Sequence, residues 1–274
     1  MPSFPVRRLL IDLDTPFERH WNGGDAFRTA WFNALSMSFP LGEQFFIDSV
    51  RAGVKALPPG QRAPFEAQVQ GFVGQEATHR RIHALFNAQL ARQGLVNAWE
   101  PRIVRRLRRM AGFTDPRHAV AVTAALEHFT AVLSKHLLEH PQALDGATPR
   151  LATMWLWHAC EESEHRSVAF DVYRALGGDE RWRRRWMRLV AFHFTTDVLR
   201  QTARNLWHDG TLFHWRTWRS AASFLFGTHG VVRHAFRPWR RWFRADFHPA
   251  QADVRLAEEW LRSNPDRYAV VDRP

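Results

Sequence analysis

Two Glu-x-x-His motifs are the part of this sequence best suited to chemistry. They begin at Glu76 and Glu162 and end at His79 and His165. A glutamate and a histidine three residues apart lie on one face of an α-helix, so both side chains can reach one metal ion. Carboxylate oxygens combined with imidazole nitrogens suit iron or manganese better than a structural zinc site, which usually contains cysteine. The motifs therefore predict metal binding.

An upstream glutamate accompanies each motif. Glu43 precedes Glu76 by 33 residues, and Glu127 precedes Glu162 by 35 residues. Helix-breaking residues lie near both midpoints, at 57–60 (Leu-Pro-Pro-Gly) and 140–146 (His-Pro-Gln-Ala-Leu-Asp-Gly). Two antiparallel hairpins with these turns would bring each glutamate level with its motif. A four-helix bundle that holds two metal ions needs one glutamate from each of two helices and Glu-x-x-His from each of the other two.

Neighbouring residues extend the candidate site. His158 lies one helical turn before the second motif and shares its face, so we expect it to be a seventh ligand. His83 lies one turn after the first motif, and we expect it to hydrogen-bond a metal ligand and not to bind the metal itself. Glu161 could replace the motif glutamate if the register shifted by one, but the i,i+3 spacing favours the motif residue. We expect His128 to face a neighbouring helix and Cys160 to be a small packed residue. The predicted ligands of the two metal ions are Glu43, Glu76, His79, Glu127, His158, Glu162 and His165.

The elements that must position these residues are helices. Helical periodicity dominates the 274 residues, without a convincing series of alternating strands. A helix is expected to open near Asp25, to be interrupted at residues 38–40 and to continue over 41–57. Further helices are expected over 62–93, 99–110, 115–139 and 148–176. The fold class is therefore predicted to be all-α, a four-helix bundle with additional C-terminal helices.

Composition limits the class of protein. The single cysteine excludes an internal disulfide framework and fits a reducing compartment. The sequence has neither the pattern of a signal peptide nor a run of about 18 apolar residues that could span a bilayer. We expect a soluble, cytoplasmic protein, with peripheral contact to the inner face of the membrane as an option.

The character of the chain changes after Gly178. Residues 181–244 contain 14 arginines, no lysine and only two acidic residues, together with seven of the 13 tryptophans. We expect a metal-binding domain at 1–178 and a basic, Trp-rich helical extension at 179–274 that packs on it. Arginine among tryptophan suits an anionic membrane surface. An acidic partner or nucleic acid is an alternative, nucleic acid being the weaker, and simple packing by the tryptophans with solvated arginines is another.

The segment 190–197 is apolar and aromatic, with His193 and Asp197 one turn apart. It belongs either to the core or to the wall of an apolar pocket over the metals. Together with the basic extension, it suggests a hydrophobic or amphipathic small-molecule substrate such as a lipid-derived acyl chain.

Three stretches resemble the bacterial family labelled "predicted metal-dependent hydrolase", which is placed in the ferritin-like superfamily. They are residues 39–43, 75–79 and 157–165, the last followed by 168–173. The resemblance covers about residues 5 to 265 and implies a ferritin-like bundle. A more distant resemblance is to the di-iron aminoarene N-oxygenases, which place a histidine four residues before the final Glu-x-x-His, as His158 is placed here. The basic extension has no counterpart in them.

Two classes of reaction remain open. A reduced pair of iron ions could activate O2 to oxidise a substrate, which would also require an electron donor protein. Two metal ions could instead activate water for hydrolysis. Four glutamates and two histidines on a helical bundle favour, by analogy of fold, an O2-activating oxidoreductase of the oxygenase or hydroxylase type with two iron ions, manganese being the alternative metal. A metal-dependent hydrolase is the alternative enzyme. A third hypothesis, which we favour less, is iron storage or a non-catalytic binding protein.

Overall fold

The structure, a computed structural model, describes residues 4–271 and is all-α apart from one short pair of strands. The helices are α1 (Ala26–Ala56), α2 (Pro59–Arg92), α3 (Glu100–Met110), α4 (Pro116–Glu139), α5 (Pro149–His165), α6 (Val168–Ala175), α7 (Glu180–His208), α8 (Trp215–Phe226), α9 (Val231–Arg241) and α10 (Arg255–Ser263). Single 3-10 turns are η1 (Pro141–Leu144), η2 (Pro249–Gln251) and η3 (Pro265–Arg267), and the strands are β1 (Arg7–Leu9) and β2 (Tyr268–Val270). The prediction of an all-α fold is confirmed.

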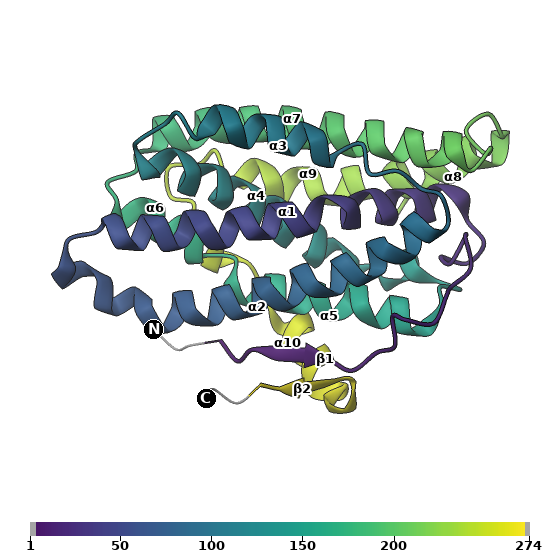
Figure 1. Cartoon of the computed structure of the whole chain (residues 1–274), viewed down its shortest axis with the longest axis horizontal. Helices are drawn as coiled ribbons and strands as arrows, with labels where there is room; N and C mark the ends of the chain where they lie inside the picture. Colours follow the sequence, from purple (N-terminus) through teal and green to yellow (C-terminus); the bar gives the residue numbers. More distant parts are fainter. Residues whose placement is uncertain (1–3, 272–274) are drawn as a thin grey trace.

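Long helices form the frame of the molecule (Figure 1). α1 and α2 run across it as a hairpin, and α4 and α5 form a second pair that packs against the first. α7 lies along α1 and α4, and α9 packs on α4. β1 and β2 pair antiparallel, next to α2, and so join the two ends of the described chain.

Local sequence explains where the helices begin. The Asp25 carboxylate accepts a hydrogen bond from the backbone N–H of Arg28 and caps α1. Asp115 and Asp179 cap α4 and α7 in the same way. Each carboxylate accepts a hydrogen bond from a backbone N–H that has no partner within its own helix. Its negative charge also interacts favourably with the positive end of the helix dipole.

The predicted interruption at residues 38–40 is wrong, because α1 is continuous through Pro40. Proline has no N–H to donate to the carbonyl four residues earlier, which here belongs to Ser36. The side-chain amide of Asn87 on α2 donates to that carbonyl at 2.9 Å instead. A contact from the neighbouring helix therefore replaces the hydrogen bond that proline removes.

The helix predicted at 148–176 is two helices, α5 and α6, separated at Arg166 and Ser167. The Arg166 guanidinium bonds the carbonyl of Ser163 in its own helix and the carbonyl of Pro249 in η2. The Arg166 side chain therefore links the junction between α5 and α6 to the C-terminal segment that contains η2. The sequence did not predict the two short strands, because three-residue strands carry too little pattern to recognise.

Two hydrophobic clusters form the core. One is centred on Trp21, Phe86 and Trp157, and the other on Phe72 and Tyr173. Both include residues from before and after Gly178, such as Leu206 in the first and Trp242 in the second, so the basic extension shares the core. The division at residue 178 remains a prediction from sequence.

In the described part of the chain, no helix is long and apolar enough to cross a membrane.

Candidate metal centre

The seven predicted ligands converge between α1, α2, α4 and α5. Each of these residues is at most 3% exposed. Glu43 comes from α1, Glu76 and His79 from α2, Glu127 from α4, and His158, Glu162 and His165 from α5. The rings of His79 and His165 pack edge-on against Trp157 and Phe72, respectively, one residue from each hydrophobic cluster. The polar centre is thus enclosed by the two halves of the core.

The two Glu-x-x-His motifs form the first group of donors. One donor atom from each of Glu76, His79, Glu162 and His165 lies within 4.8 Å of the other three. Glu162 Oε1 is 3.3 Å from His79 Nδ1 and 3.6 Å from His165 Nε2. His165 Nε2 is also 3.6 Å from Glu76 Oε1. One ion could therefore contact both motifs.

Glu127 joins this group through the other nitrogen of His165. Glu127 Oε2 is 2.9 Å from His165 Nδ1. That contact holds the imidazole so that Nε2 faces the motif carboxylates. The other oxygen of Glu127, Oε1, has no hydrogen-bond partner within the described residues and is available to bind a metal ion.

Glu43, His83 and His158 form the second group, again with donor atoms within 4.8 Å. His158 Nε2 is 3.4 Å from Glu162 Oε1, the oxygen that also faces His79 and His165. The carboxylate of Glu162 therefore lies between the two groups, where it could bridge two ions.

His83 is part of a hydrogen-bonded chain. Its Nε2 is 3.1 Å from His158 Nδ1, and its Nδ1 is 2.9 Å from Ser36 Oγ. Both ring nitrogens of His83 thus have partners, while His158 Nε2 faces the centre. This geometry fits His158 as a ligand and His83 as the residue that orients it, although His83 itself lies within reach of an ion.

Many polar atoms of the centre have no hydrogen-bond partner among residues 4–271. They are both carboxylate oxygens of Glu43 and of Glu76, Glu127 Oε1, Glu162 Oε2, His79 Nδ1 and His165 Nε2. Leaving buried carboxylates without partners is costly, and native proteins rarely do so. Cations would satisfy these atoms together. The residues present therefore fit metal ions.

Burial and charge set the ionisation of the centre. Burial raises the pKa of Glu43, Glu76 and Glu127 above the ordinary glutamate value. Burial also acts to raise the pKa of Glu162, but the imidazoles around it outweigh burial and lower that pKa. Without a cation, carboxyl groups with a raised pKa keep their protons to higher pH than ordinary glutamates, so metal binding competes with protonation.

A supporting network behind His79 could not be read from the sequence. His79 Nε2 is 2.9 Å from Glu161 Oε2, and Arg7 Nη1 is 3.1 Å from Glu161 Oε1. Arg7 also bonds Glu164. Burial by itself lowers the pKa of His79, but its contacts with Glu161 and Glu162 raise it to about 10. Both oxygens of Glu161 therefore have protein partners, and Glu161 holds the imidazole so that Nδ1 faces the motif carboxylates, as residues behind metal ligands commonly do.

Other residues singled out from the sequence lie away from the centre. His128 Nε2 is 3.2 Å from the carbonyl of Trp239 on α9. Cys160 is buried in the core, and burial raises the pKa of its thiol. Both side chains therefore have packing roles.

An apolar cavity of about 350 Å³ adjoins the centre. Glu43 is one of its lining residues, and α3, α4 and α7 supply much of the wall. The lining includes Val190, His193, Phe194 and Asp197. This favours the hypothesis that segment 190–197 forms the wall of an apolar pocket. Asp197 is fully buried and its carboxylate binds the guanidinium groups of Arg102 and Arg106 on α3.

Comparison with known proteins bears on the reaction. A family model described as "Predicted metal-dependent hydrolase" matches residues 5–253. The description contradicts the oxidoreductase favoured from the sequence and supports the hydrolase held as the alternative. The error came from assigning a reaction by analogy of fold, because the same donor set can activate water. The O2 co-substrate and the electron donor were expected only for the oxidoreductase.

No curated protein and no solved structure is significantly similar to the chain. Since the family match spans most of its length, the chain belongs to the predicted metal-dependent hydrolase family.

Proposed function

We propose that this protein is a hydrolase that holds two divalent metal ions and cleaves a hydrophobic or amphipathic small molecule. The observation that carries the proposal is the group of buried carboxylate oxygens and imidazole nitrogens beside an apolar cavity, which have no hydrogen-bond partner within residues 4–271. The proposed ligands are Glu43, Glu76, His79, Glu127, His158, Glu162 and His165. Two bound metal ions would lower the pKa of a coordinated water and polarise the bond to be cleaved.

Other side chains of the protein position the proposed metal ligands. Glu161 and Arg7 keep His79 in one tautomer and orientation, with Nδ1 toward Glu162. Ser36 and His83 do the same for His158. Positioning of this kind lets the ligands bind metal without reorganising.

The cavity supports the class of substrate. Phe46, Leu126 and Phe194 line it with apolar surface, which would hold an acyl or aromatic group and keep bulk water away. Arg109 lies at the same cavity and is exposed, so it could receive an anionic head group. Glu43 connects this cavity to the donor groups.

We propose Fe2+ or Mn2+ as the metal, because glutamate oxygens outnumber imidazoles among the proposed ligands and no thiolate is present among them. The order of the donors, a glutamate and then Glu-x-x-His, occurring twice on four packed helices, supports a relationship to ferritin-like bundles. The resemblance to aminoarene N-oxygenases is limited to the position of His158, and it does not indicate which reaction the protein catalyses.

The test is hydrolysis by chelator-treated protein reloaded with Fe2+ or Mn2+, using chromogenic esters and phosphates with short and long apolar groups. We expect turnover that depends on metal and rises with the apolar group. Absence of metal-dependent hydrolysis across the panel would contradict the proposal.

A matched pair of glycine variants tests the cavity. Gly42 lines it, and a Cβ added there meets no atom of another segment within 4 Å, so the side chain of Gly42→Leu starts from open space beside the cavity. Gly60, at the start of α2, is equally free of neighbours, and it does not line the cavity. Gly42→Leu should reduce turnover of the long substrates while metal content stays the same, and Gly60→Leu should leave both unchanged. Equal behaviour of the two variants would show that the substrate binds elsewhere.

A further inference from the structure

A second group of histidines lies at the surface, where α4 ends. His136 is in the last turn of α4 and His140 is its C-cap residue. His229 lies in the loop between α8 and α9, and His234 lies in the first turn of α9. These histidines are 89 or more residues apart across the two segments, so only the fold brings them together.

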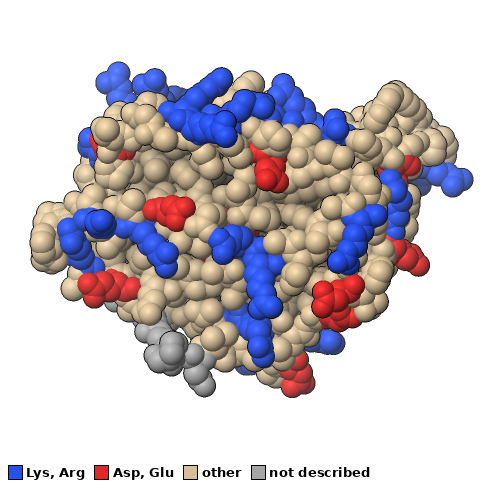
Figure 2. Space-filling model, viewed as in Figure 1, with Lys and Arg blue, Asp and Glu red and all other residues tan. Residues whose placement is uncertain are grey.

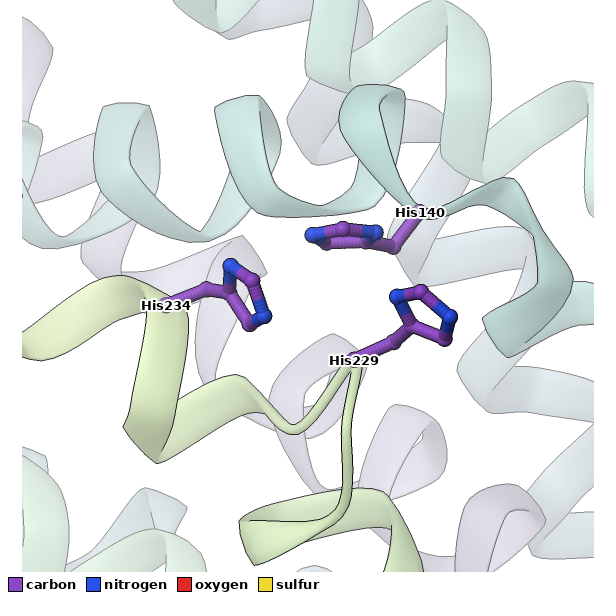
Figure 3. A group of neighbouring side chains, drawn as sticks. All are labelled: His140, His229 and His234. Atoms are coloured by element: carbon purple, nitrogen blue, oxygen red, sulfur yellow. The ribbon is translucent and has the colours of Figure 1, made fainter.

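The rings of three of these histidines surround one point. A ring nitrogen from each of His140, His229 and His234 lies within 4.8 Å of the other two. Figure 3 shows the three rings converging from the end of α4, the α8–α9 loop and α9. The ring centroids of His140 are 4.4 Å from His234 and 4.9 Å from His229. Three imidazoles at this spacing match the ligand set of a mononuclear metal site.

One ring of the group has a hydrogen bond that fixes its tautomer. His234 Nε2 is 2.8 Å from the carbonyl oxygen of Thr228. Nε2 therefore donates its hydrogen to that carbonyl, which leaves Nδ1 as a neutral donor with a free lone pair. Metal-binding histidines typically fix their tautomer in this way.

His136 supplies an independent observation. It is 5% exposed, and neither of its ring nitrogens has a hydrogen-bond partner in the described structure. Its ring centroid lies 4.9 Å from that of His140 and 5.9 Å from that of His234, and it lines the same open cavity as His140 and His229. A buried imidazole with no partner is uncommon, and a bound ion with its water would give it one.

This cluster is separate from the centre described above. Glu127 is 13 residues before His140 on the same helix, a rise of roughly 20 Å at 1.5 Å per residue. The clusters share no residue. Their chemistry differs too, because one is rich in carboxylates and the other offers only imidazole.

We propose that His140, His229 and His234 form a mononuclear Zn2+ site. Imidazole suits zinc, and three protein ligands leave a fourth tetrahedral position for water or an anion. The carboxyl end of α4 lies at His140, where the helix dipole favours a cation. Arg216 and Arg219 line the adjoining cavity; they oppose a bare cation but favour an anion in the fourth position. Bound zinc would cross-link the end of α4 to the α8–α9 loop.

The experiment is a titration of chelator-treated full-length protein with Zn2+ against a chromophoric chelator, which counts the ions held per chain. His229→Ala and His140→Ala should each hold one ion fewer than the unaltered protein. The double variant should also hold one fewer, not two, because both side chains bind the same ion. His214→Ala is the control, since His214 is exposed at the start of α8 and outside the cluster.

The variants must retain the helical circular dichroism of the unaltered protein, which the exposure of His229 favours. Hydrolysis at the carboxylate-rich centre should persist in His229→Ala. An unchanged count in either single variant, or an equal loss in His214→Ala, would overturn the site.

Discussion

The buried centre and the arginine-rich surface are two polar regions of the same chain, and they differ in whether they require a partner. The carboxylates between α1, α2, α4 and α5 are buried and make few hydrogen bonds with residues 4–271, so cations would stabilise them. The arginines of α3 and α7 form a band along the upper edge of the molecule in Figure 2, exposed to solvent at Arg105, Arg181 and Arg185. Water already satisfies them. Polar residues therefore indicate a ligand strongly where they are buried and weakly where they are exposed.

Arg183 shows the difference within a single helix. It is the buried arginine of the α7 band, and its guanidinium lies over the rings of Phe170 and Trp242 and donates to the carbonyl of Arg244. It joins α7 to the segment after α9, whereas the exposed arginines on either side have no such role.

The largest effect is expected from removing a buried carboxylate. Glu76→Ala should leave metal content well below two ions per chain and reduce hydrolysis by more than about 100-fold, because losing a direct ligand should cost more than the 10–100-fold typical of residues behind the ligands. Glu162→Ala should do the same. Glu66→Ala, an exposed position on the same helix as Glu76, is the control. Full metal content in both site variants, measured by elemental analysis, would show that these carboxylates do not bind metal.

The two histidines of the second donor group should differ. His158→Ala should remove a direct ligand and weaken metal binding by about 100-fold, whereas His83→Ala should weaken it by about 10-fold, since His83 acts through His158. Competition with a chelator measures both affinities. The assignment of roles would be reversed if His83→Ala proved the more damaging change.

Arg7 connects the surface strand β1 to the centre. Arg7→Gln should lower metal affinity by about 10-fold, because Glu161 would lose its partner and hold His79 less firmly. Arg8→Gln, at the neighbouring exposed position, should have no effect. Equal affinities for the two variants would mean that the network behind His79 is structural only.

The smallest effect concerns the arginine band. We propose that it binds anionic bilayers, with about 1 kcal/mol or less from each basic residue. The triple variant Arg181→Glu, Arg185→Glu and Arg188→Glu should reduce sedimentation with anionic vesicles, and high salt should abolish binding of the unaltered protein. Charge reversal at Arg51, Arg81 and Arg92, exposed on α1 and α2, is the control. Equal binding to anionic and neutral vesicles would leave the band as an ordinary solvated face.

Local spacing accounts for what the sequence predicted about the fold and the site. The hairpin turns near residues 58 and 141, and the i,i+3 motifs, are properties of short segments, so the four helices and the meeting of Glu43 with the motif residues could be anticipated. The break after His165 and the continuity of α1 through Pro40 depend on partners from other segments, Pro249 and Asn87. No local pattern contains them.

Long-range contacts also explain what sequence reasoning missed at the two sites. Arg7 is 154 residues from Glu161, and no spacing rule connects them. The histidines at 140, 229 and 234 carry no motif, because they become neighbours only when α9 packs on α4. Only the family match favours hydrolysis, because a set of metal ligands does not determine what the metals do.

Anomalous diffraction from crystals of Mn2+-loaded protein tests the central claim most directly. Two peaks are expected between α1, α2, α4 and α5, about 3.5–4 Å apart as in two-metal hydrolytic sites. One should lie among Glu76, His79 and His165, the other beside Glu43 and His158, with the Glu162 carboxylate between them. A single peak in this region, or peaks only outside it, would contradict the paired centre.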